Sequence, residues 1–335
     1  MCYAFASALC SRSVDRVRVF LANLLARDMV NFTFADNVKG YPSPVVPDVV
    51  HFVFLGNRPL TLVEAICIRA AWLQQRPRRL VLHCQNCSAL SLSFYWGLVE
   101  TVPGLDMQHV EFPEDVLGAR CTDAELRTLV ALAVLLATGG VYVDRDTYLL
   151  SNADAYRRFE MALAWYPEGR VRTELIVAHR NARLLRLLFD AHRRCLSQRS
   201  GHAERLNKTD EVLIANSSLM SLFHEIPVAT KGAIAAMTSS IALPSAETAR
   251  MLYSTNCDHS WRELAAVSLM TGSVEQMTET RGDPRVNLVT IASSRTNFGQ
   301  MARLALSGST GMGAKNIRDV SKISTLQYAE EPCKY

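Results

Sequence analysis

Two aspartates stand two positions apart after a short apolar segment, in the run Val143-Asp144-Arg145-Asp146. In an extended chain alternate side chains share one face, so Asp144 and Asp146 are expected to converge while Arg145 points to the other side. Carboxylate oxygens are ligands that Mn²⁺ and Mg²⁺ prefer, and phosphate oxygens and water fill the remaining positions. The pair is therefore interpreted as a candidate catalytic and metal site that binds a diphosphate.

The segments before the pair are typical of a strand that leads to a ligand site. Thr122 and Glu125 form a capping-box pattern at the start of a helix, and Gly139 is typical of a left-handed helix end. Residues 129–137 are apolar on every face, which predicts a helix buried against a sheet. A strand predicted over 141–143 then leads into the pair, and this setting favours a metal and diphosphate site over a solvated turn.

The chain before this helix alternates between strand and helix patterns. Residues 49–55 form a continuous apolar run, which predicts a strand buried on both faces. Thr61 and Glu64 make a second capping box, opening a helix expected to end near Trp72, and residues 80–83 form the next strand. The alternation continues with a helix over 90–101 and a strand over 108–112, and weaker patterns beyond residue 154 predict a strand over 162–166 and a helix over 182–197. It indicates an α/β fold with a mostly parallel sheet flanked by helices.

Composition and charge exclude several classes of protein. The 335 residues are 49% hydrophobic and 20% charged, which is typical of a globular chain and too apolar for a disordered one. The net charge is only +4, and no aromatic residues interleave with the basic ones, so we predict no nucleic-acid partner. No window reaches the roughly 18 to 20 apolar residues of a membrane span. We therefore predict no membrane span, and no signal or anchor is visible.

Cys84 and Cys87 form a C-x-x-C pattern within a set of nine cysteines. One such pair without a second falls short of the four ligands of a structural zinc site. A disulfide and ordinary half-buried thiols both stay open, and half-buried thiols are the favoured prediction.

Around the first strand and the D-x-D pair, the sequence resembles glycosyltransferase family 32. Members of that family are similar to the large clostridial glucosylating toxins and to metazoan α-1,4-sugar transferases. Residues 50–54, Val-His-Phe-Val-Phe, match the family's first strand, and residues 122–150 match its D-x-D region. The resemblance implies a GT-A (Rossmann-like) fold, a divalent metal and a nucleotide-sugar donor. It also implies that six residues bind the donor, with Phe54 stacking on the base: His51, Phe54, Gly139, Gly140, Tyr142 and Asp144.

The resemblance further implies the metal ligands and the reaction. Asp146 would ligate Mn²⁺ or Mg²⁺, and Asp144 would contact the metal, the ribose or the sugar. His259 is the candidate third ligand, although an ordinary surface or half-buried histidine is the more frequent role for such a residue. The implied enzyme is a retaining hexosyl- or N-acetylhexosaminyltransferase. It would move a sugar from a UDP- or GDP-sugar to a hydroxyl of a glycan, a glycolipid or a protein.

The sequence departs from the family at two positions of the helix before the strand. Family members usually carry an aspartate and an arginine at the places that fall on Thr128 and Ala131, while Asp123 and Arg127 lie one turn earlier. A catalytically impaired pseudo-glycosyltransferase that acts as a binding protein is therefore the alternative. A phosphohydrolase of the haloacid dehalogenase type also uses D-x-D, but Tyr148 stands where that class has threonine or valine.

The resemblance also implies how the chain divides into domains and where the protein resides. We expect residues 1–44 to form an N-terminal extension and linker, and residues 45–330 to form the transferase domain. The donor half would cover about 45–150 and the acceptor half about 151–330. Relatives commonly reside in the Golgi, so the resemblance implies the Golgi or secretory lumen. A cytoplasmic location stays open, because no signal or anchor is visible.

Overall fold

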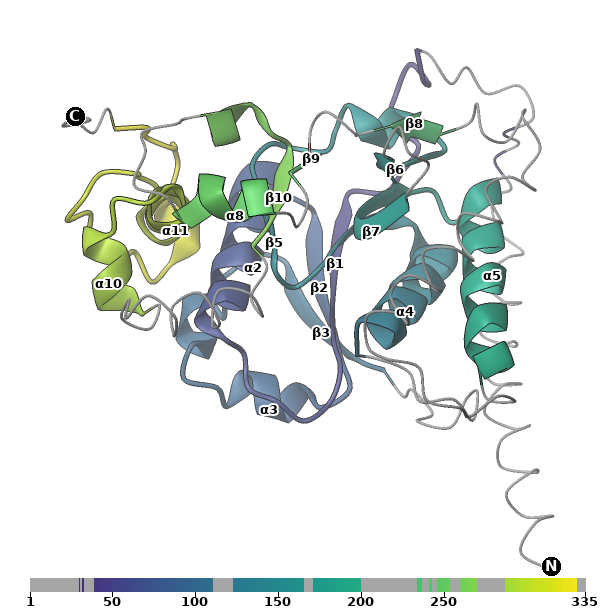
Figure 1. The fold of residues 1–335 in the computed structure, drawn as a ribbon, viewed down its shortest axis with the longest axis horizontal. Helices are drawn as coiled ribbons and strands as arrows, with labels where there is room; N and C mark the ends of the chain where they lie inside the picture. Colours follow the sequence, from purple (N-terminus) through teal and green to yellow (C-terminus); the bar gives the residue numbers. More distant parts are fainter. Residues whose placement is uncertain are drawn as a thin grey trace, which may run out of the picture. The chain divides into compact units, whose positions relative to one another are not determined.

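The computed structural model in Figure 1 describes residues 30, 32, 39–110, 123–165, 171–199, 234–236, 241–242, 246–253, 260–269 and 287–329. The chain divides into two compact units, each built from three segments. Unit 1 comprises Met1–Pro47, Val110–Tyr142 and Tyr156–Ala236, and unit 2 comprises Asp48–His109, Val143–Ala155 and Met237–Tyr335. The division of residues 45–330 into a donor half and an acceptor half stays a prediction.

Unit 2 begins with the predicted strand–helix–strand motif. Strand β1 (Val49–Phe54) pairs in parallel with β2 (Arg79–Cys84), and helix α2 (Leu62–Gln75) connects them. The Thr61 hydroxyl accepts the N–H of Glu64 at 3.3 Å, and the Glu64 carboxylate accepts the N–H of Thr61 at 2.9 Å. The predicted capping box is therefore confirmed, and α2 runs one turn further than expected.

Strand β3 (Leu105–His109) completes a parallel set in the order β3-β2-β1. It begins three residues before the strand predicted over 108–112, of which residues 111 and 112 lie outside the described part of the chain. Parallel strands joined by a crossover helix are the signature of α/β proteins. The predicted class, an α/β fold with mostly parallel strands flanked by helices, is confirmed.

The helix predicted over 90–101 is wrong. A short helix α3 (Cys87–Ser91) and a 3₁₀ turn η1 (Trp96–Leu98) occupy this stretch instead. Between them, the hydroxyl of Ser93 donates to the carbonyl oxygen of Leu90 at 2.7 Å. Serine side chains that bond to nearby backbone groups compete with helix formation, and this explains the early end of α3.

A smaller sheet of unit 2 follows the D-x-D pair. Strand β5 (Thr147–Leu149) pairs antiparallel with β10 (Ala266–Ser268), which pairs in parallel with β9 (Ile241–Ala242). Tyr148 and Trp261 are buried in an apolar cluster with side chains of α2 and of the later helices. The later elements of unit 2 are α8 (Ala246–Tyr253), η3 (Ser260–Glu263), α10 (Leu288–Ser293), α11 (Asn297–Ser307) and η4 (Val320–Lys322).

Arg69 joins α2 to the C-terminal part of unit 2. Its side chain is fully buried, and its guanidinium donates to the backbone carbonyls of five residues at 2.7 to 3.3 Å: Leu98, Ala305, Leu306, Ile317 and Arg318. Burial lowers the pKa of Arg69 to about 10, so the group keeps its charge at neutral pH. A buried cation needs acceptors, and these carbonyls therefore fix α11 and the following segment against α2.

Unit 1 contains the helix predicted before the D-x-D pair. Helix α4 (Asp123–Thr138) is buried over most of residues 129–137, as predicted, and packs against α5 (Arg183–Arg199), as Figure 1 shows. Thr122, half of the predicted capping box, lies outside the described residues. Gly139 follows α4 with φ of +67°, which confirms the predicted left-handed end.

Two described strands of unit 1 agree with the predictions, and two others, over 171–178 and 234–236, were not predicted. Strand β4 (Gly140–Val143) covers the strand predicted before the D-x-D pair, although its last residue belongs to unit 2. Strand β6 (Met161–Trp165) pairs antiparallel with β7 (Val171–Ala178) and in parallel with β8 (Ile234–Ala236). Helix α5 covers the helix predicted over 182–197. In the described part of the chain, no helix combines the length and the apolar character needed to cross a bilayer.

Gly139 tests whether the end of α4 depends on glycine. An alanine Cβ would lie 3.0 Å from Pro47 Cδ and 3.1 Å from the carbonyl oxygen of Ala178, at a left-handed φ. We expect Gly139→Ala to lower the free energy of unfolding by about 2 kcal/mol or more, because backbone strain and overpacking add. Gly313 has φ of +76° with no atom within 4 Å of such a Cβ, so Gly313→Ala is the matched control, costing about 1 kcal/mol. Equal losses in urea unfolding would contradict this account of the packing.

Candidate functional site

The D-x-D pair lies in a β-turn of unit 2. The carbonyl oxygen of Asp144 accepts the N–H of Thr147 at 2.9 Å, and Asp144 Oδ1 accepts the N–H of Arg145 at 2.9 Å. The chain has to turn here because β5 begins at Thr147, and the carbonyl of Asp146 accepts the N–H of Leu269, next to β10, at 2.8 Å. The prediction that the pair sits in extended chain is therefore wrong.

The two half-buried carboxylates nevertheless lie close to one buried group. Cys67 of α2 is fully buried, and its thiol pKa is raised by burial and then by the charges of Asp146, Glu64 and Asp144. The pKa of Tyr253 is likewise raised by burial, and further by Cys67 and Asp146. Three carboxylates therefore lie within electrostatic range of a single thiol, which stays protonated at neutral pH.

Glu64 is a charged residue of this site that the sequence analysis assigned only to helix capping. Its side chain is 4% exposed, and its Oε1 accepts from Arg58 Nη2 at 2.6 Å and lies 3.7 Å from Arg145 Nε. A signal for this role was present in the sequence, because a carboxylate within an apolar helix needs a cationic partner when it is buried. The partners themselves are set by the tertiary fold.

The residues of β1 that were predicted to bind the donor are buried. His51 and Phe54 are each 2% exposed, and His51 Nδ1 lies 3.0 Å from His83 Nε2 on β2. The ring of Phe54 stacks on that of Phe52 with centroids 6.4 Å apart, and the Arg58 guanidinium lies 5.9 Å from the Phe54 centroid. A base that stacks on Phe54 would have to displace neighbouring side chains, and the roles of both residues stay predictions.

Three further residues predicted to bind the donor belong to unit 1. Gly139 and Gly140 have φ of +67° and +127°, and Tyr142 is 2% exposed within β4. Their contacts with a nucleotide stay predictions. His259, the candidate third metal ligand, lies outside the described residues, so its role stays a prediction as well.

The departures from the family pattern lie on α4. Thr128 Oγ1 is 3.3 Å from Thr173 Oγ1, and Ala131 is 1% exposed, so neither position supplies a charge. Arg127, one turn earlier, forms an ion pair with Asp123. The arginine is therefore engaged within α4 itself.

The donor set at the D-x-D turn suits a hard divalent cation. Among the described residues, no group of three or more His, Cys, Asp or Glu side chains is arranged to hold a metal ion. Mg²⁺ at phosphate sites usually takes one or two carboxylates and completes its shell with phosphate oxygens and water. Asp144 and Asp146 fit that pattern in number and in ligand type.

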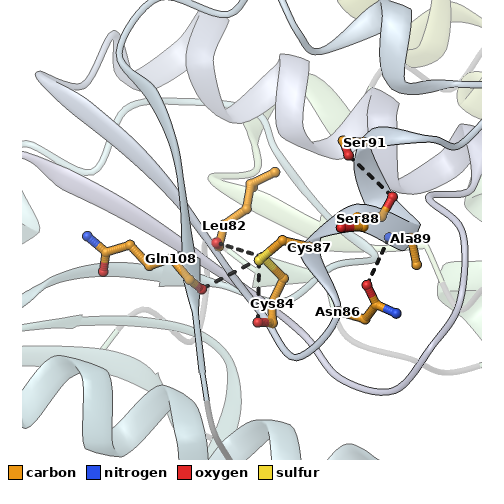
Figure 2. The surroundings of a disulfide bond; sticks show 8 residues. All are labelled: Leu82, Cys84, Asn86, Cys87, Ser88, Ala89, Ser91 and Gln108. Atoms are coloured by element: carbon orange, nitrogen blue, oxygen red, sulfur yellow. Dashed lines mark hydrogen bonds between the residues drawn. A yellow bond between two sulfur atoms is a disulfide. The ribbon is translucent and has the colours of Figure 1, made fainter.

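The C-x-x-C pattern forms a disulfide between Cys84 and Cys87, with Cα atoms 5.1 Å apart (Figure 2). The predicted half-buried thiols are therefore wrong at these positions. Asn86 explains the pairing, because its side chain accepts the N–H of Ala89 at 3.1 Å and starts α3 directly after β2. This turn brings the two Cα atoms within the range that a disulfide spans.

Comparison with known proteins gives likeness in structure alone. No protein-family model and no curated protein matches the sequence. The PaToxG glycosyltransferase is 11% identical over 90% of this chain and 97% of its own, with a TM-score of 0.42. The galactosyltransferase LgtC, solved with donor and acceptor sugar analogues, is 10% identical over 72% of this chain and 98% of its own, with a TM-score of 0.37. The glycosyltransferase GlyE of Streptococcus pneumoniae TIGR4 is 11% identical over 57% of this chain and 45% of its own, with a TM-score of 0.36. Each TM-score lies below 0.5, and none of these likenesses assigns an activity to the chain.

The pair of buried histidines predicts a loss of stability in acid. Burial, and next the neighbouring His51, lower the pKa of His83 to about 3, whereas an unfolded histidine titrates near 6.5. Below pH 6.5 this histidine is therefore protonated in the unfolded chain but not in the folded one. The free energy of unfolding consequently falls as the pH is lowered. We expect His83 to account for a loss of about 2 kcal/mol between pH 7 and pH 5.

Urea unfolding at the two pH values measures this loss. His83→Gln should remove most of it, while the control His109→Gln, at an exposed position of β3, should retain it. An unchanged pH dependence in His83→Gln would contradict the assignment.

The disulfide predicts a modest effect of reductant. A cross-link that closes so short a loop stabilises by about 2 kcal/mol through chain entropy. We expect a phosphine reductant to lower the free energy of unfolding by about this amount in the native protein, and by nothing in a Cys84→Ser, Cys87→Ser variant. Mass spectrometry after alkylation should find both cysteines labelled only after reduction. Labelling without reductant would show that the pair is not oxidised.

Proposed function

We propose that the chain is a metal-dependent glycosyltransferase that moves a sugar from a UDP- or GDP-sugar to a hydroxyl acceptor. The observation that carries the proposal is the D-x-D turn, which holds the carboxylates of Asp144 and Asp146 half-buried directly after a buried strand. A pair of hard oxygen ligands with a cationic neighbour, Arg145, suits a cation that shares its shell with a diphosphate.

In the proposed site, Asp146 is a metal ligand and Asp144 contacts the metal, the ribose or the sugar. A bound Mn²⁺ or Mg²⁺ would neutralise the charge that develops on the departing diphosphate. Hydrogen bonds of the turn fix the backbone of both aspartates and the Asp144 carboxylate before the donor arrives, which reduces the reorganisation that binding requires. The sugar would be transferred to the acceptor hydroxyl with retention of configuration, as the family resemblance implies, and the nucleoside diphosphate would be the leaving group.

Cys67, the buried cysteine near the turn, does not have the properties of a catalytic nucleophile. A cysteine nucleophile requires a thiolate at a site that substrate can reach. Cys67 is fully buried and its pKa is raised, so it stays a neutral thiol out of reach of a sugar. The proposed role of the chain is therefore to bind and orient the donor, and no covalent intermediate on Cys67 is expected.

The acceptor and the compartment are proposed on chemical grounds. The acceptor would be a hydroxyl of a glycan, a glycolipid or a protein, and the transferred group a hexose or an N-acetylhexosamine. The Cys84–Cys87 disulfide supports an oxidising compartment such as the Golgi or secretory lumen, since disulfides persist there. His259 as the third ligand and Phe54 as the base platform complete the proposal.

Calorimetric titration with UDP and GDP, with and without Mn²⁺, tests the proposed donor site. We expect one nucleotide to bind in a Mn²⁺-dependent manner, and Asp146→Asn to weaken this binding at least tenfold because it removes a charged ligand. Asp106→Asn is the matched control, since Asp106 is a half-buried aspartate of β3 that pairs with Arg79 and is no part of the proposed site. No binding of either nucleotide at millimolar concentration would overturn the proposal.

The pseudo-glycosyltransferase is retained as a second candidate, because Thr128 and Ala131 supply no charge from α4. The two functions differ in one readout. A transferase consumes a nucleotide-sugar in the presence of Mn²⁺, and slow hydrolysis can be followed by release of UDP or GDP. Mn²⁺-dependent binding without consumption of any donor sugar would favour the binding protein.

A further inference from the structure

Glu64 is the buried charge that the capping of α2 does not explain. Its Oε2 accepts the N–H of Thr61 at 2.9 Å, which completes the capping box. A glutamine serves a capping box equally well, and it avoids the cost of burying a charge. The negative charge of Glu64 is therefore explained by its two cationic neighbours, Arg58 and Arg145, and not by the capping of the helix.

The two arginines lie on two different parts of the proposed donor site. Arg145 stands between the aspartates of the D-x-D turn, and its Nε is 3.7 Å from Glu64 Oε1. Arg58 follows β1, with its guanidinium 5.9 Å from the centroid of Phe54. One carboxylate therefore contacts a cation beside the proposed metal ligands and a cation beside the proposed base platform.

One N–H group of Arg58 has no acceptor in the described part of the chain. Its Nη2 donates to Glu64 at 2.6 Å, while its Nε is buried and has no hydrogen-bond partner among the described residues. A buried N–H without an acceptor costs free energy, and a ligand that supplies an acceptor oxygen recovers that cost. Guanidinium groups bind phosphate oxygens strongly, because several N–H donors lie in one plane.

The local charges favour an anion once a divalent cation is present. Taken by themselves, the carboxylates of Glu64, Asp144 and Asp146 and the guanidiniums of Arg58 and Arg145 sum to one net negative charge. A bound Mn²⁺ or Mg²⁺ reverses this to one net positive charge, which attracts a diphosphate.

We propose that Glu64 is a positioning residue that holds Arg58 and Arg145, and that the partly exposed guanidinium of Arg58 donates to a phosphate oxygen of the bound nucleotide. The inference rests on the proposed function and names the cation that binds the donor phosphates, a charge that Ala131 does not supply. Arg58 is the phosphate-binding group, and Glu64 acts on the ligand only through the two arginines.

Binding of the nucleoside diphosphate that binds the native protein, compared with its nucleoside, tests the inference. In the presence of Mn²⁺, Glu64→Gln and Arg58→Gln should each weaken binding of the diphosphate at least tenfold and change binding of the nucleoside by a much smaller factor. Arg58→Lys should recover part of the loss, because it restores the charge without the planar fork. Thr61→Ala is the matched control: it removes the capping hydroxyl, keeps Glu64, and should bind the diphosphate within twofold of the native protein.

The double variant separates positioning from general damage to the fold. If Glu64 acts through the arginines, adding Glu64→Gln to Arg58→Gln should weaken diphosphate binding by less than the product of the two single losses. Losses that multiply, or a Glu64→Gln protein that binds the diphosphate normally, would overturn the inference while leaving the proposed function intact. Absence of nucleotide binding in the native protein would overturn both.

Discussion

Five backbone carbonyls converge on the guanidinium of Arg69, and this buried cation sets the position of α2 within unit 2. The carbonyls belong to the turn at Leu98 and to the end of α11 and the segment after it, so parts of the chain that are distant in sequence meet at one side chain. Glu64 and Cys67 lie on the same helix. The interaction that fixes the position of α2 therefore also fixes the Glu64 carboxylate and the Cys67 thiol near the D-x-D turn.

The segment that carries the D-x-D turn is attached to α2 at both ends. Near the start of the helix, Glu64 meets Arg145. At its end, the side chain of Gln75 accepts the N–H of Ala153 at 2.7 Å and donates to Asp154 at 3.0 Å. The turn is thus held by polar contacts to one rigid helix, which suits a site that has to keep two carboxylates in place before a ligand binds.

Much of the fold could be predicted because its signals are local. The buried run of β1, the capping box of α2 and the glycine after α4 each depend on residues close together in the sequence, and each is found where it was expected. The helix over 90–101 was predicted wrongly because serine side chains compete for the backbone there, an effect that hydrophobic periodicity does not contain. The same limit applies to the D-x-D pair, whose turn is imposed by the pairing of β5 with β10.

The charged partners in the site could not be predicted because they depend on tertiary contacts. Nothing in the spacing of Arg58, Glu64 and Arg145 shows that the three side chains meet, and only the fold brings the third of them to the first two. The contact between His51 and His83 likewise requires the register of β1 against β2. Sequence patterns thus located the aspartates, whereas the cations around them came from the structure.

X-ray diffraction from crystals grown with Mn²⁺ and UDP or GDP, recorded at the manganese absorption edge, tests the central claim most directly. The account predicts an anomalous peak bound by the carboxylates of Asp144 and Asp146, with the diphosphate of the nucleotide completing the metal shell. An ordered nucleotide or a manganese peak elsewhere in the molecule, with the D-x-D carboxylates unliganded, would contradict it.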